Sequence, residues 1–129
     1  MSYYFTKKVN SDFETSIMEV TEKLKEKGFG VLTEIDVQST LKKKIDVDFY
    51  KYRILGACNP HFAHKALLEE DKVGVMLPCN VIVQQKSDSE QVEVSAVDPI
   101  ASMSAIQNEN LGGIANEVQQ LLKSVIDEL

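Results

Sequence analysis

The chain has 129 residues, of which 43% are hydrophobic and 26% charged, and its formal net charge is −6. These values are typical of one soluble globular domain that spans residues 1–129 and buries a core of its own. The negative charge argues against a nucleic-acid-binding surface, which needs clustered Lys and Arg, and no apolar run approaches the roughly 20 residues of a membrane span. The first residues lack the hydrophobic core of a signal peptide, so we expect a cytoplasmic protein that binds neither nucleic acid nor membrane.

Hydrophobic periodicity and capping signals predict strands that alternate with helices. Ser11 and Glu14 fit a capping box at the start of the first helix, and Gly28 marks its end. Asp36 is the expected cap of the second helix, and Asn59 is the expected cap of the third. In chain order, we expect a strand over 3–9, a helix over 11–28, a strand over 29–35, a helix over 37–45, a strand over 49–57, a helix over 60–71, strands over 74–85 and 91–97, a short irregular or helical piece over 98–106, and a helix over 110–129.

This β-α-β-α-β-α-β-β-α order predicts an α+β fold. Strand–helix–strand units imply parallel pairing, whereas the hairpin expected at residues 87–89 requires one antiparallel pair. The expected architecture is therefore a single domain with a mixed five-stranded sheet and helices mainly on one face.

The two cysteines and two histidines of the chain fall within one stretch, as Cys58, His61, His64 and Cys79. If the third helix connects two parallel strands, it descends about 18 Å, and the next strand regains the level of Cys58 near Cys79. The hairpin would then bring Asp98 to the same level. We therefore expect one end of the sheet to gather a candidate ligand-binding or redox site made of Cys58, Asn59, Cys79, Asn80 and Asp98.

The position of Cys58 just before a helix favours a reactive thiol, because the helix dipole and free N–H groups stabilise a thiolate. Such a site would respond to redox conditions, or bind a small ligand or a soft metal. The competing interpretation is that both cysteines are small buried hydrophobic residues. Cys58, His61 and Cys79 are weak candidates for zinc ligands, because their spacing matches no structural zinc pattern. No nucleotide-binding or hydrolase motif is present, and we expect no cofactor.

Pro78 lies inside the predicted strand 74–85, where it cannot donate a hydrogen bond to the sheet. It indicates either a bulge that redirects Cys79 or Asn80, or a strand that begins later than the hydrophobic pattern suggests.

The sequence ACNP at residues 57–60 and the sequence LPCN at residues 77–80 together resemble the family known as domain of unknown function 302. The resemblance covers nearly the whole chain. It implies a compact α+β domain that forms homodimers, and it implies no activity, since none is established for the family. The family motif carries over onto Cys58, Asn59, Pro60, Pro78, Cys79, Asn80, Asp98 and Pro99.

Two functions from different classes are compatible with these features. One is a small thiol module that is redox-responsive or binds a small molecule or soft metal at Cys58 and Cys79. The other is a non-catalytic homodimeric binding or interaction domain in which the cysteines are structural, and the last helix or the sheet face makes the dimer.

Overall fold

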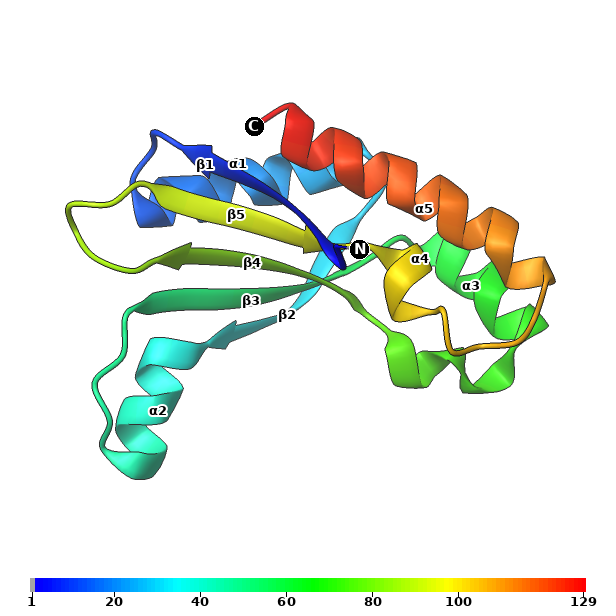
Figure 1. The fold of residues 1–129 in the computed structure, drawn as a ribbon, viewed down its shortest axis with the longest axis horizontal. Helices are drawn as coiled ribbons and strands as arrows, with labels where there is room; N and C mark the ends of the chain where they lie inside the picture. Colours follow the sequence, from blue (N-terminus) through cyan, green and yellow to red (C-terminus); the bar gives the residue numbers. More distant parts are fainter. Residues whose placement is uncertain (1) are drawn as a thin grey trace.

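The computed structural model describes residues 2–129, which form one α+β domain built on a single five-stranded sheet (Figure 1). The predicted order of the main strands and helices is confirmed. The elements are β1 (Tyr4–Val9), α1 (Phe13–Glu26), β2 (Gly30–Asp36), α2 (Val37–Ile45), β3 (Lys51–Cys58), α3 (Pro60–Glu69), the 3-10 helix η1 (Asp71–Met76), β4 (Cys79–Gln85), β5 (Val92–Val97), α4 (Pro99–Ser102) and α5 (Asn110–Asp127).

Helix α1 begins one residue later than the capping box suggested. The side chain of Asp12 accepts a hydrogen bond from the Thr15 amide at 2.8 Å and satisfies one of the free N–H groups of the first turn. The hydroxyl of Ser11, the predicted cap, donates instead to Glu19 at 2.9 Å. The predicted apolar stripe of the helix is buried, at Phe13, Ile17, Val20 and Leu24.

The sheet is antiparallel throughout, with the strand order β1-β5-β4-β3-β2, so the prediction of a mixed sheet was wrong. The error lies in the connection between β3 and β4. Helix α3 packs against α5 and η1 rather than running back along the sheet, and Figure 1 shows α3 beyond the end of the strands. The chain therefore re-enters the sheet at the end where it left, and a return at the same end gives antiparallel strands.

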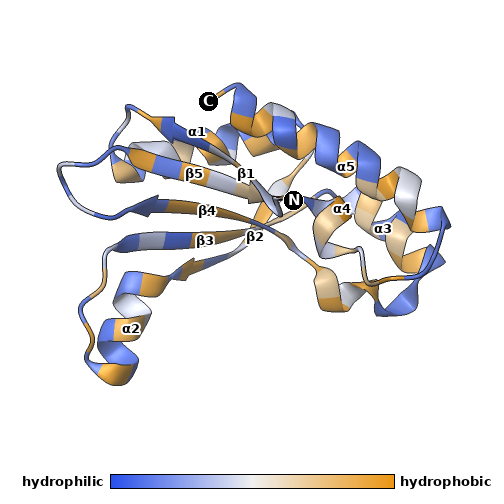
Figure 2. Ribbon diagram, in the orientation of Figure 1, coloured by the Kyte–Doolittle hydropathy of each residue, from blue (hydrophilic) through white to orange (hydrophobic). Residues whose placement is uncertain are grey.

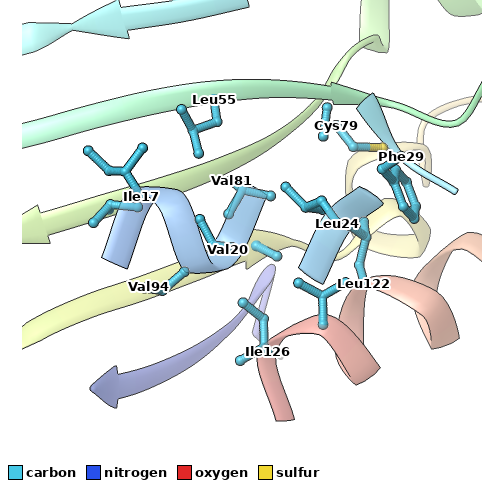
Figure 3. Packing of buried hydrophobic residues seen from close by; sticks show 14 of the residues in the cluster. Ile17, Val20, Leu24, Phe29, Leu55, Cys79, Val81, Val94, Leu122 and Ile126 are labelled. Atoms are coloured by element: carbon cyan, nitrogen blue, oxygen red, sulfur yellow. The ribbon is translucent and has the colours of Figure 1, made fainter. Parts of the chain in front are cut away.

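Helices α1 and α5 cover one face of the sheet, as predicted. Their apolar stripes and the inward residues of the strands form the main core, which includes Leu24, Leu55, Val81 and Leu122, all fully buried (Figure 3). Along β4, the buried Cys79, Val81 and Val83 alternate with more exposed residues, and Figure 2 shows the middle of this strand as hydrophobic and its end near the hairpin as hydrophilic. Burial on one face only fixes which side of each strand faces the core.

Strand β4 begins at Cys79, later than the predicted start at residue 74. The preceding apolar residues form η1, whose Val73 is fully buried. Pro78 thus precedes the strand and needs no hydrogen-bond partner in the sheet. Of the two interpretations of this proline, the later start of the strand is the correct one.

None of the helices formed by residues 2–129 has the length and apolar character that a membrane span requires.

Candidate functional site

The two cysteines lie at the same end of the sheet, on neighbouring strands. Cys58 is the last residue of β3, Cys79 is the first residue of β4, and Ala57 is the direct partner of Cys79 in the antiparallel ladder. Strand geometry then puts the Cα atoms of Cys58 and Cys79 about 6 Å apart. The predicted proximity rested on a parallel crossover, but it arises here because one cysteine ends a strand and the other begins the antiparallel return.

Both cysteines line one small cavity of about 40 Å³ between the sheet end and helices α3, α4 and α5. In an ideal strand, Cys58 and Ala57 would point to opposite faces. Strand β3 ends at Cys58, however, where the chain turns into α3. Cys58 is therefore not bound to the alternation of the strand, and both Ala57 and Cys58 line the cavity. The cavity walls are largely apolar and include Phe29 and Phe62, and Figure 3 shows the Cys79 sulfur pointing toward the Phe29 ring.

The two thiols have different environments. Cys79 is 8% exposed, and burial, followed by the nearby Cys58, raises its pKa from the ordinary 9.0 to about 11. Cys58 is half-buried. It directly precedes Asn59, the N-cap of α3, whose side chain accepts a hydrogen bond from the Phe62 amide. The more accessible thiol is therefore also the one next to a helix N-terminus.

The other residues of the predicted site do not all join the cysteines. Asn59 lines the same cavity. Asn80 is exposed and lines a shallow hollow on the uncovered face of the sheet. Asp98 caps α4 by accepting from the Ile100 amide at 3.0 Å, and it also accepts from Gln119 Nε2 at 3.1 Å. The structure thus groups Cys58, Asn59 and Cys79, and separates Asn80 and Asp98 from them.

The histidines lie away from the cavity. His61 and His64 are exposed on α3, and neither contributes to the walls around the cysteines. Within residues 2–129, no group of three or more His, Cys, Asp or Glu side chains is arranged to hold a metal ion. A zinc site made of Cys58, His61 and Cys79 therefore gains no support from the geometry.

Sequence reasoning missed one residue of the cavity wall, Met103, and one close neighbour of that wall, Gly56. Met103, the C-cap of α4, lines the cavity together with the cysteines. Gly56 is buried beside the cavity, where an added Cβ would meet Pro78 Cγ at 2.8 Å and would also collide with Thr33 Oγ1. No local pattern connects either residue with the cysteines, because the approach depends on how α4 and β2 pack.

The sheet face opposite α1 and α5 is open. It carries a shallow hollow of about 480 Å³ whose walls include Tyr3, Tyr4 and Tyr52. Across this face, Ile54 lies opposite Ile82 in the β3–β4 ladder. Burial, followed by the neighbouring tyrosines Tyr50 and Tyr3, raises the pKa of Tyr52. The hollow combines these tyrosine rings with polar side chains such as Asn80 and Gln84.

The comparisons with known proteins agree on one family. The family described as "Domain of unknown function DUF302" matches residues 5–129. A solved structure, the crystal structure of an uncharacterised conserved DUF302 protein from Bacillus stearothermophilus, is similar with a TM-score of 0.90 and 28% sequence identity over 98% of each chain. No match was found among curated proteins. The chain therefore belongs to the DUF302 family of domains of unknown function.

Proposed function

We propose that this domain is a dithiol module of the reducing cytoplasm, in which Cys58 receives an oxidant or soft electrophile and Cys79 is its buried partner. The observation that carries the proposal is the shared cavity at the sheet end, into which β3 and β4 bring both cysteines. The Cα separation that strand geometry implies for the two cysteines, about 6 Å, falls within the range that a disulfide spans, about 4.4–6.8 Å.

The size of the cavity argues for thiol chemistry rather than for an organic ligand. Small-molecule sites usually enclose about 300–1,000 Å³, whereas this cavity has about 40 Å³. A space of that size admits a water molecule or a single ion. The reactive groups are therefore the two sulfurs themselves.

The two thiols would act in a fixed order. Cys58 attacks a low-molecular-weight disulfide, forms a mixed disulfide with one half and releases the other half as a thiol. Cys79 then loses its proton to solvent and attacks the Cys58 sulfur, and the second half of the reagent leaves. In total, two protein thiols are oxidised to one disulfide, while one reagent disulfide is reduced to two thiols.

Reaction of the folded protein with 2,2′-dithiodipyridine tests this order. We expect two thiopyridones per chain, released in two phases, and a final protein mass lower by two hydrogens with no pyridyl group retained. The second phase should accelerate about tenfold per pH unit between pH 7 and 9, because the thiolate fraction of Cys79 grows at that rate below its pKa of about 11.

Single cysteine variants are the matched controls. Cys79→Ser should release one thiopyridone and keep a stable pyridyl adduct on Cys58, whereas Cys58→Ser should react far more slowly because Cys79 is only 8% exposed. A wild-type protein that retains two pyridyl adducts, or that reacts only when unfolded, would contradict the proposal.

Helix α2 favours a second function, that of a homodimeric interaction module. None of the α2 residues is buried, and Ile45 is 62% exposed, although an amphipathic helix normally buries its apolar stripe. The exposed Ile35 and Val47 extend this apolar surface on either side of the helix. We propose that a second copy of the chain covers α2 together with the open sheet face.

The exposed surface of the sheet face and α2 is close in area to what a second copy of the chain would cover in a dimer. Five strands of about six residues present a face of roughly 500 Å², and α2 adds to it. A standard interface buries about 800 Å² per partner. The open face and α2 together therefore approach the size of a stable dimer interface.

Sedimentation of the full chain at tens of micromolar tests this second function. We expect a wild-type dimer, and Ile45→Glu should weaken its association at least tenfold because a carboxylate would be buried in the interface. Leu68→Glu is the control, since Leu68 is 74% exposed on α3, at the other end of the molecule (Figure 1). A monomeric wild type, or equal effects of the two variants, would exclude this interface.

A further inference from the structure

Three sulfur-containing residues from separate parts of the chain line the same cavity. Cys58 ends β3, Cys79 begins β4, and Met103 follows the last turn of α4. All three line the 40 Å³ space, in which the other walls are largely apolar. Met18 and Met76, by contrast, lie away from the cavity and are 68% and 38% exposed.

The set of donors points to a soft metal ion. Thiolate and thioether ligands select Cu(I), zinc and iron–sulfur clusters from the metals that proteins bind. Structural zinc requires four ligands, and iron–sulfur clusters are usually held by four cysteines. The cavity offers two cysteines and one methionine, without either histidine. Of the three, Cu(I) is the ion that matches two thiolates and one thioether.

We propose that this cavity binds a single Cu(I) ion through the sulfur atoms of Cys58, Cys79 and Met103. The inference rests on the proposed dithiol function, and it names the soft ion that the dithiol site takes. Binding replaces the two thiol protons with one cation, so two protons are released and no electron is transferred.

The surroundings favour this ion over harder cations. A space of about 40 Å³ has room for one ion without a full hydration shell. Mg²⁺ and Ca²⁺ require several oxygen ligands, whereas the cavity places aromatic and small apolar side chains such as Phe29, Phe62 and Ala63 around the sulfurs. Two thiolates and one singly charged ion leave one net negative charge at the site, and the half-buried Cys58 is the thiolate that solvent can reach.

Besides lining the cavity, Met103 packs against a second apolar cluster of the fold. This cluster lies around Val73 and Leu111 and includes Leu77, two residues before Cys79. The methionine and the start of β4 are therefore held by the same group of side chains. This shared support holds Met103 at the cavity wall without a local sequence signal.

Anaerobic titration of the reduced full chain with Cu(I), in competition with the chromophoric chelator bicinchoninate, tests the proposal. We expect one Cu(I) per chain, and X-ray absorption should show sulfur as its only ligand type. Met103→Leu keeps the size and apolar character of the side chain but removes the sulfur, and it should weaken Cu(I) affinity by about tenfold or more. Cys58→Ser and Cys79→Ser should weaken it further.

Met18→Leu is the matched control, because it makes the same change on the exposed side of α1 and should leave the affinity unchanged. Equal affinities for wild type and Met103→Leu, a nitrogen or oxygen ligand in the absorption spectrum, or more than one Cu(I) per chain would overturn the three-sulfur site. Met103→Leu remains informative if Cys79→Ser does not fold. Wild-type protein that exchanges with dithiodipyridine but takes no Cu(I) overturns this inference alone, whereas failure of the exchange overturns the dithiol function.

Discussion

Replacing Gly56 with alanine is expected to destabilise the fold by about 2–4 kcal/mol, which is a large fraction of the stability of a small domain. The added Cβ would lie 2.8 Å from Pro78 Cγ and would collide with the Thr33 hydroxyl. Gly56 is buried in β3, which lies between β2 and β4, so the Thr33 and Pro78 side chains or the backbone of these segments must shift to make room. Because Pro78 directly precedes Cys79, the same shift should slow dithiol exchange.

Chemical denaturation measures this effect, and Gly30→Ala is the matched control. Gly30 lies in β2 opposite Cys58, and an added Cβ there would meet no atom within 4 Å. We expect Gly30→Ala to change stability by less than about 1 kcal/mol. Combining Gly56→Ala with Thr33→Ala should recover part of the loss, because the hydroxyl is removed while the contact with Pro78 remains. Equal midpoints for the two glycine variants would show that β2 and β4 leave room for a methyl group.

The wild-type protein is expected to lose stability above pH 9 because of Cys79. Burial raises the pKa of this thiol from 9.0 to about 11, so the folded protein keeps the proton when the unfolded chain releases it. The unfolded state then binds fewer protons, and stability falls with rising pH. This contribution to stability is present below pH 9, is smaller by roughly 1 kcal/mol at pH 10, and is smaller by roughly 3 kcal/mol once the pH passes 11.

Unfolding free energies of wild type and Cys79→Ala, each measured at pH 8 and pH 10, isolate this contribution. The alanine variant should be less stable at pH 8 because it loses buried sulfur contacts. Its further loss of stability between pH 8 and pH 10 should be smaller than that of wild type by roughly 1 kcal/mol. Other groups that titrate in this range, such as Tyr52, are common to both proteins and cancel in the comparison. Equal losses would mean that the Cys79 thiol titrates normally in the folded state.

Most of the secondary structure could be predicted because its signals are local. The caps Asp36 and Asn59 each bond to an amide within three residues, and Pro60 occupies the first turn of α3. The stripe of α1 repeats with the period of a helix and is buried as expected. Where local signals were ambiguous, the prediction was wrong, as in the apolar residues before Cys79 that form η1 instead of extending β4.

The candidate site could be predicted only in part. Cys58, Asn59 and Cys79 meet because they flank the ends of two adjacent strands. Asn80 is directed to the open face by the alternation of side chains along β4, and Asp98 is engaged in capping α4. Met103 lines the cavity because of how α4 packs in the fold, and the residues around it in the sequence do not indicate this.

The sequence by itself determined the identity and order of the main strands and helices, and it placed Cys58 between the third strand and the third helix. Only the tertiary structure decided that β4 runs antiparallel to β3, that Cys79 is nearly sealed while Cys58 is half-exposed, and that a methionine joins them. The physical reason is the range of the interactions involved. Caps and periodicity act over three or four residues, whereas strand direction and burial depend on where α3 packs against α5, across some fifty residues of chain.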